Sequence, residues 1–236
     1  MKTSRIAIAA LLTLGLSVVG SDALAGKKTS DDGKKKQTTE ETSTEETQYK
    51  QIRMGKIKEF KPTYTSAKGL LETVTSFETA LNGMHDSTRE AADIGKDEPL
   101  KKAFNKTKRT ASDKLIVTLE KGRIPKVSAK DAPDNVTTFI DQVNLNVDIA
   151  EGLIQGAKGI PEQVDVLVGE LTGIPARITP DLMKKNDLKV KDLQKQVNVA
   201  KHNLEATREA KPRAEGVLKS ARHYMELVKS LAETDS

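Results

Sequence analysis

The residue types that could carry out chemistry are few in this chain and lie far apart. The chain has no cysteine and three histidines, His85, His202 and His223. A helix that binds a metal through one turn needs ligands three or four residues apart, and no Glu-x-x-His or His-x-x-x-His occurs. A phosphate-binding loop and a nucleophile elbow are also missing. We therefore expect a protein that is not an enzyme and that carries no cofactor and no metal.

The tripeptide Gly-Ile-Pro occurs twice, at residues 159–161 and 173–175. One interpretation is a repeated anion-binding loop, but neither copy has the further glycines and the Lys-Ser/Thr that such a loop requires. The other is helix punctuation, because a glycine with positive φ commonly ends a helix and proline is tolerated at the start of the next. We favour punctuation around a helix from Ile160 to Ile174. A strand through Val164, Val166 and Val168 is the alternative.

A basic cluster is the candidate for a binding surface. Residues 101–114 contain six bases and one acid. The cluster that could face an anion or a partner consists of Lys101, Lys102, Lys106, Lys108 and Arg109. Residues 131–172 carry eight acids and one base, and residues 184–195 carry five bases and two acids. We favour pairing of these opposite charges within the fold, and an open face for an anionic partner is the alternative.

The N-terminus has the pattern of a secretory signal. Two basic residues lie within MKTSR, an apolar run spans residues 6–20, and Ala23-Leu24-Ala25 supplies small residues for cleavage. The run is shorter than the roughly 20 residues of a spanning helix, which disfavours an uncleaved anchor. We assign residues 1–25 to a signal peptide and expect an exported chain, periplasmic or extracellular, with no transmembrane segment after cleavage.

Residues 26–61 differ in composition from the rest of the chain. Lys, Thr, Ser and Glu dominate the segment, which lacks the apolar residues needed to offset the cost of ordering. We assign it to a disordered polar linker. A basic arm for nucleic acid or lipid headgroups is the alternative, but an acidic block directly follows the lysines. Export and the small number of aromatic residues, four Phe and three Tyr, argue against nucleic acid.

Residues 62–236 carry helical periodicity. Apolar residues recur every three or four positions from Ala67 to Ala91 and from Val136 to Ala157. A less regular series from Leu100 to Leu119 predicts another helix that ends at Gly122. A heptad series then runs from Val190 to Ala232 and places His202 and His223 on its outer face. Because the series keeps its phase across Pro212, we favour one kinked helix over a hairpin.

Together these patterns predict an all-α protein. We expect an elongated antiparallel helical bundle or coiled coil of about five helices. The expected function is a non-catalytic binding or scaffold module of the cell envelope, which meets a protein partner or itself through its helical seams. The alternative is an amphipathic lipid- or anion-binding protein at the membrane surface, although its helices have no Trp. We do not expect nucleic acid as a partner, whereas an anionic envelope component fits either function.

Overall fold

The protein is described here by a computed structural model, which describes residues 49–111 and 114–232. The predicted signal peptide and residues 26–48 of the predicted linker lie outside the described residues. The prediction of an all-α helical bundle is confirmed. Among the helices of the described part, none is long and apolar enough to cross a bilayer.

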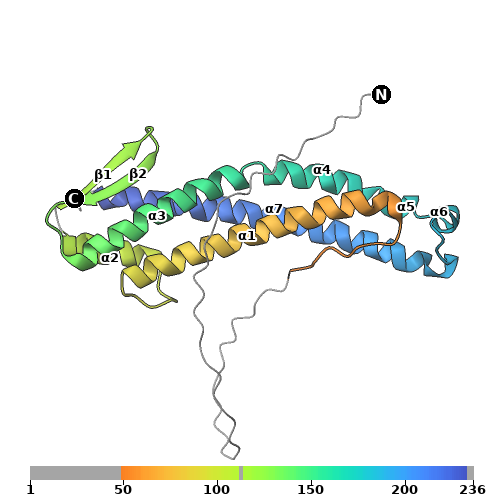
Figure 1. Ribbon diagram of the computed structural model, residues 1–236, viewed down its shortest axis with the longest axis horizontal. Helices are drawn as coiled ribbons and strands as arrows, with labels where there is room; N and C mark the ends of the chain where they lie inside the picture. Colours follow the sequence, from red (N-terminus) through yellow and green to blue (C-terminus); the bar gives the residue numbers. More distant parts are fainter. Residues whose placement is uncertain (1–48, 112–113, 233–236) are drawn as a thin grey trace, which may run out of the picture. The chain divides into compact units, whose positions relative to one another are not determined.

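Three long helical stretches lie lengthwise against one another (Figure 1). They are α1 (Lys61–Ala91), α3 (Asp134–Ala157) continued by α4 (Ile160–Thr172), and α7 (Leu193–Lys229). Helices α1 and α7 run in the same direction, and α3 and α4 run in the opposite one. The fold is therefore an up-down-up bundle in which the middle member is broken once.

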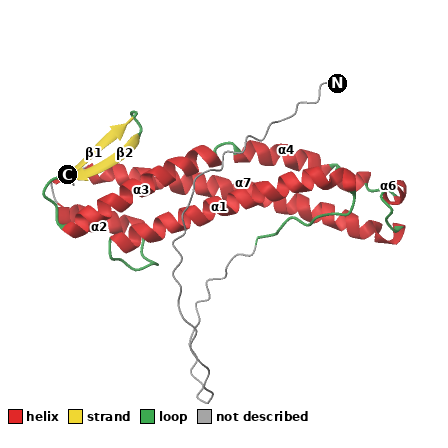
Figure 2. Cartoon of the chain, viewed as in Figure 1, coloured by secondary structure: helices red, strands yellow, loops and turns green. Residues whose placement is uncertain are grey.

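Short elements close the two ends of the bundle (Figure 2). One end carries α2 (Leu100–Ala111) and a hairpin of β1 (Leu115–Glu120) and β2 (Ile124–Ala129). The other end carries the 3-10 turn η1 (Lys58–Phe60), α5 (Ile174–Arg177), α6 (Pro180–Lys185) and the 3-10 turn η3 (Val190–Asp192). The 3-10 turn η4 (Ser230–Ala232) follows α7 and lies next to β1.

The predicted apolar faces of α1, α3 and α4 are the ones that the bundle buries. Ala67, Val74 and Met84 of α1 are buried, as are Val143 and Val147 of α3. The helical assignment of residues 160–172 is confirmed, so the alternative of a strand there is wrong.

Helix α7 passes through Pro212 without interruption, which confirms one helix rather than a hairpin. Half of its predicted heptad seam is wrong by one residue. The buried series steps by four and three along the helix: Gln196, Ala200, Asn203, Thr207, Ala210, Ala214, Val217, Ala221, Tyr224, Val228 and Leu231. Ala200, Thr207, Ala214, Ala221 and Val228 are buried, as predicted. Leu204, Lys211 and Leu218 were also predicted to lie in the seam, but they are only half-buried. These seam residues are already covered within the chain itself.

The two Gly-Ile-Pro sites are helix boundaries, as predicted, but their geometry differs from the expectation. Gly159 has a φ of −88° and Gly173 a φ of −80°, so neither adopts the left-handed conformation. In both places the chain stays close to helical, and the following proline, which lacks an N–H, opens the next helix. At these boundaries the chain therefore bends but keeps its direction, instead of turning back.

The predicted helix from residue 100 to Gly122 is wrong in its second half. Helix α2 ends at Ala111, and β1 begins at Leu115. Leu115 and Leu119 have helical spacing, but Ile116, Val117 and Thr118 between them are β-branched residues that favour a strand. Gly122, at a φ of 71°, lies in the turn of the hairpin rather than at a helix end.

Candidate functional site

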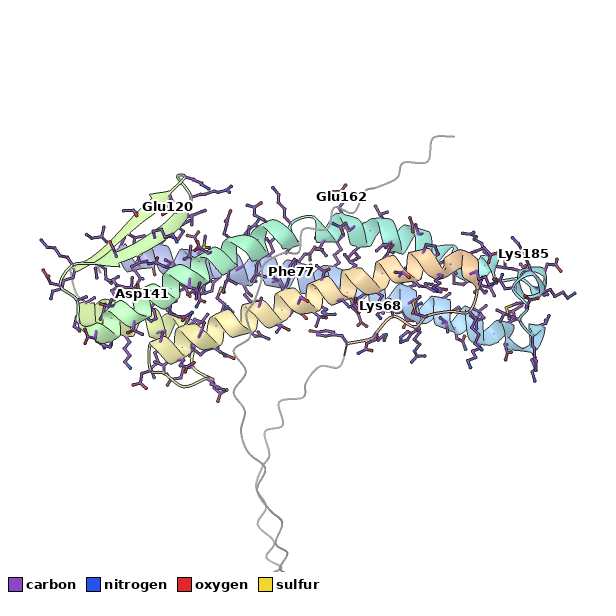
Figure 3. All side chains as sticks on the ribbon, in the orientation of Figure 1. Lys68, Phe77, Glu120, Asp141, Glu162 and Lys185 are labelled. Carbon is purple, nitrogen blue, oxygen red and sulfur yellow. The ribbon has the colours of Figure 1, made fainter. Side chains whose placement is uncertain are left out.

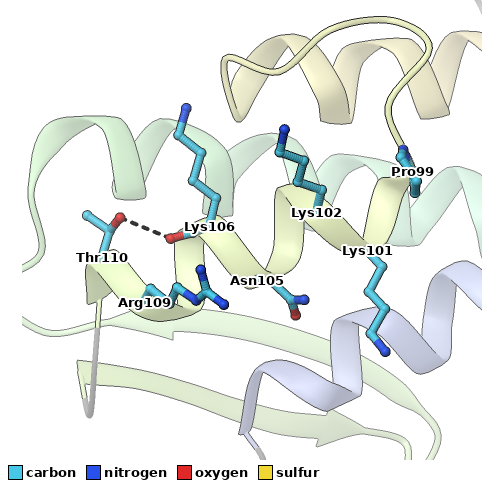
Figure 4. A pocket seen from close by; sticks show the side chains of 7 residues that line it. All are labelled: Pro99, Lys101, Lys102, Asn105, Lys106, Arg109 and Thr110. Carbon is cyan, nitrogen blue, oxygen red and sulfur yellow. Dashed lines mark hydrogen bonds between the residues drawn. The ribbon is translucent and has the colours of Figure 1, made fainter.

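The predicted basic cluster lies on the exposed side of α2. Ala103, Phe104 and Thr107 turn the other side of this helix into the core. The exposed face is hollowed by a depression of about 580 Å³ (Figure 4). Its lining consists of Pro99, Lys101, Lys102, Asn105, Lys106, Arg109 and Thr110. Four of the five predicted site residues therefore share one surface, and Lys108 is half-buried beside it.

Two bases of the cluster, Lys102 and Lys106, have partners within the chain. Lys102 pairs with Glu98 one turn earlier, with Nζ and Oε1 2.5 Å apart. Lys106 donates through Nζ to the carbonyl oxygens of Ala92 and Asp93, at 2.8 and 2.9 Å. These carbonyls end α1, where the helix dipole favours a cation. Lys106 is therefore a cap of α1 as well as part of the basic face.

Lys101 and Arg109 differ from these two. Both side chains are exposed, and neither makes a hydrogen bond or an ion pair with any residue that the structure describes. In Figure 4, Lys101 extends on the opposite side of α2 from Lys102 and Lys106, and Arg109 lies along the helix. Together with Lys102 they leave this face positively charged.

Among the described residues, none of Lys101, Lys102, Lys106 and Arg109 pairs with the acidic segment 131–172, in contrast to the expectation. The acids of that segment with ion-pair partners contact the hairpin and α7 instead: Asp148 with Lys126 at 3.2 Å, Glu151 with Arg123 at 3.0 Å, and Asp165 with Lys211 at 2.8 Å. In the basic stretch 184–195, Lys185 pairs with Glu59. The intramolecular interpretation of the charge pattern is therefore wrong for the partners of α2.

A second site involves residues 49–58, which we call the strap. This segment lies within the predicted linker, yet its backbone is held on α7 and the segment before it. Three strap N–H groups donate to side-chain amide oxygens: Arg53 to Asn203 (2.8 Å), Lys56 to Gln196 (3.0 Å) and Lys58 to Asn186 (2.9 Å). Asn203 also donates to the carbonyl oxygen of Arg53 at 2.7 Å. One buried amide thus satisfies both backbone groups of a strap residue, as a neighbouring strand would.

The spacing of these contacts follows from two chain geometries. Asn203 and Gln196 are seven residues apart on α7, which corresponds to about 10.5 Å of helix. Arg53 and Lys56 are three residues apart on the strap, and three extended residues cover about 10 Å. The strap and the seam therefore stay in register. Gly55 lies between the two contacts, and a β-carbon there would be 2.8 Å from the Tyr64 ring, so no larger residue fits without a shift.

The strap begins beside a buried arginine in the middle of α7. The Arg213 guanidinium pairs with Glu78 of α1, donates to Thr75, and has the Tyr49 ring 3.9 Å away. Hydrogen bonding to Glu78 raises the pKa of Arg213 further. Strap, α1 and α7 border a hollow of about 1150 Å³ at this point. Lys50 pairs with Glu205 at 2.9 Å, which raises the pKa of Lys50.

Two of the three histidines, His202 and His85, contact other parts of the chain. The ring nitrogen Nε2 of His202 lies 2.9 Å from the carbonyl oxygen of Gln51, so this residue helps to hold the strap. His223 is exposed, as predicted. His85 stacks against Tyr224 with ring centroids 6.4 Å apart. Burial, followed by the charge of nearby Arg89, lowers the pKa of His85.

A buried polar layer crosses the bundle next to His85. Asn146 of α3 donates to Thr88 Oγ1 of α1 at 2.8 Å, and the Tyr224 hydroxyl lies 2.9 Å from the same oxygen. Thr88 gives its own proton to the Met84 carbonyl, so Tyr224 is the donor in its contact with Thr88. Burial raises the pKa of Tyr224 to about 12, which keeps this proton in place. The layer joins all three rods and fixes their register.

Within residues 49–111 and 114–232, no group of three or more His, Asp or Glu side chains is placed to hold a metal ion. Compared with protein families, with curated proteins and with solved structures, the chain matches none. Sequence reasoning missed Gln196 and Asn203, because a polar residue at a heptad position gives no apolar signal.

Proposed function

We propose that this protein is a non-catalytic helical binding module, exported to the cell envelope, whose basic α2 face meets an anionic partner. The observation that carries the proposal is the charge arrangement at α2. Lys101 and Arg109 are exposed and unpaired within the described residues, and the nearest acidic helix pairs its acids elsewhere. A surface on which bases outnumber acids attracts an acidic partner at long range.

The packing of α2 favours an acidic polymer or protein over a lipid bilayer. An interfacial helix inserts its apolar face among the acyl chains. In α2 that face is occupied, because Ala103 and Phe104 are buried in the core. Contact with lipid would therefore be limited to headgroup charge. A bilayer-inserting function is the weaker alternative.

A matched pair of charge reversals tests the proposal. The first variant carries Lys101→Glu, Lys102→Glu and Arg109→Glu, and leaves Lys106 as the cap of α1. The control carries three reversals on another exposed basic stretch, at Lys189, Lys191 and Lys195. The change in net charge is the same in both, so only the place of the charge differs.

Binding is measured with poly-L-glutamate and with vesicles of anionic phosphatidylglycerol. We expect the wild type to bind the polymer and to weaken as ionic strength rises from 0.01 to 0.15 M, where the Debye length falls from about 30 to 8 Å. The α2 variant should lose binding, and the control should keep most of it. Equal loss in both variants would mean that net charge, not the α2 face, governs binding. Vesicle binding accompanied by a gain in helicity would favour the bilayer alternative.

A further inference from the structure

The hairpin register determines which backbone groups of β1 face outward. The N–H of Lys130 donates to the carbonyl of Lys114 at 3.2 Å, so the even-numbered residues of β1 form the hydrogen-bonded pairs with β2. Leu115, Val117 and Leu119 then occupy the non-hydrogen-bonded pairs, in which N–H and C=O point away from the partner strand. These three residues present their backbone groups at the outer edge of β1.

The outward backbone groups of Val127 in β2 are hydrogen-bonded, whereas those of β1 have no such partner among the described residues, although the 3-10 turn η4 lies next to β1. Asn144 of α3 accepts from the Val127 N–H at 2.9 Å and donates to the Val127 carbonyl at 2.8 Å. Pro125 has no N–H to leave unpaired. In Figure 1, β1 is the strand on the side away from α3. The outward groups of β1 make no hydrogen bond with any residue of the described part.

The side chains of β1 do not block this edge. Natural edge strands are commonly protected by lysine, proline or a bulge. Residues 115–119 read LIVTL and contain none of these. Ile116 and Leu119 are each 52% exposed. The edge combines free backbone groups with apolar side chains.

We infer that β1 is the strand through which two copies of this chain pair, antiparallel, with Val117 opposite Val117 of the second copy. Each outward N–H and C=O of the three residues then finds a partner, since Leu115 lies opposite Leu119 of the second copy. The two hairpins form one four-stranded sheet. The exposed Leu119 side chain is covered by this pairing.

The charges at the two ends of β1 favour a second copy as the partner strand and favour one register of pairing. With Val117 at the centre, Lys114 lies opposite Glu120 of the second copy, on the same face of the sheet. Within its own chain, Lys114 Nζ donates to the carbonyl oxygen of Asp131 at 2.8 Å, which leaves its charge uncompensated. Glu120 lies at the far end of the hairpin, away from the helices (Figure 3). If the pair is centred on Ile116, Lys114 lies opposite Thr118 of the second copy. If it is centred on Thr118, Lys114 lies opposite Gly122. Opposite charges face each other only in the first register, and this complementarity argues for a second copy as the partner strand.

Cysteine pairing between two versions of the chain tests the register. In this arrangement Ile116 and Thr118 of the second copy form a non-hydrogen-bonded pair, with Cα atoms about 4.5 Å apart, within the range that a disulfide spans. Two copies of residue 116 lie diagonally, about 7–8 Å apart. The natural chain has no cysteine. Mixing the Ile116→Cys and Thr118→Cys chains under mild oxidation should give the mixed disulfide well above its random share.

Charge reversal tests the same pairing without a covalent bond. Glu120→Lys should raise the dimer dissociation constant in sedimentation equilibrium roughly tenfold, because two like-charge contacts replace two attractive ones. The double variant Lys114→Glu/Glu120→Lys should restore pairing. A thermal melt of each variant checks that the fold is kept. A chain that stays monomeric at all concentrations, mixed disulfide at its random share, or an assembly unaffected by Glu120→Lys overturns the inference. The first of these results would leave the edge to a strand from a different protein.

Discussion

Replacing Asn203 by alanine removes the strap's central contact and leaves the helical seam in place. The side chain makes two hydrogen bonds to Arg53, at 2.8 and 2.7 Å. A buried hydrogen bond contributes about 0.5–1.5 kcal/mol, so the pair contributes about 1–3 kcal/mol to holding the strap. The opening equilibrium of the strap should therefore rise roughly 5- to 150-fold.

Hydrogen exchange measures this opening directly, because the Arg53 N–H is itself a donor in the contact. We expect the Arg53 amide to exchange faster in Asn203→Ala by the same factor, while the amide of Val147 in the middle of α3 changes little. Asn198→Ala is the matched control: its side chain is exposed and pairs with Gln194. An Arg53 amide that exchanges without protection in the wild type, or equally fast in both proteins, would refute the strap as a bound element.

Two further predictions concern two glycines of α3 and His85 of α1. Gly152→Ala should stabilise the protein by up to about 1 kcal/mol, because alanine favours helix and the new methyl group meets nothing within 4 Å. Gly156→Ala should destabilise it relative to Gly152→Ala, since its β-carbon would be 2.6 Å from the Phe77 ring; urea denaturation of the pair checks the order, and equal stability would contradict it. The pKa of His85 is lowered from 6.5 in the folded state, so the unfolded chain binds more protons below that pH. Stability should fall as pH drops through the window just below 6.5, and His85→Gln should flatten this dependence in melts from pH 7.5 to 5; an unchanged slope would contradict it.

The parts of the fold that the sequence alone could predict are the helices whose apolar residues recur every three or four positions. The seams of α1, α3 and α4 consist of aliphatic residues spaced by three and four, and the structure buries them. The continuity of α7 through Pro212 could be predicted because the heptad series has the same phase before and after the proline. Two separate helices would have no reason to share one heptad frame. Removal of one backbone hydrogen bond did not break a helix held along its whole length by two neighbours.

The parts that could not be predicted depend on backbone contacts that leave no apolar pattern. The α7 seam is polar at Gln196 and Asn203, which face the strap, so the apolar residue next to each is predicted in its place. The strap itself has few apolar residues, and its bonds come from N–H and C=O groups that every sequence has. Leu115 and Leu119 fit a helix as well as a strand, and only the β-branched run between them, with Gly122 after it, indicates the hairpin.

The strap also determines how tension on the N-terminal side of residue 49 would enter the bundle. Because the strap runs opposite to α1 and α7, a pull at Tyr49 loads its contacts one after another, starting beside Arg213 and ending at Lys58. Such peeling needs much less force than shearing the same bonds together. Release of about ten residues would add roughly 33 Å of chain before the start of α1 carries any load. The three long helical stretches would stay folded while the strap is released. The strap would thus lengthen the chain under tension and rebind to α7 when the tension falls.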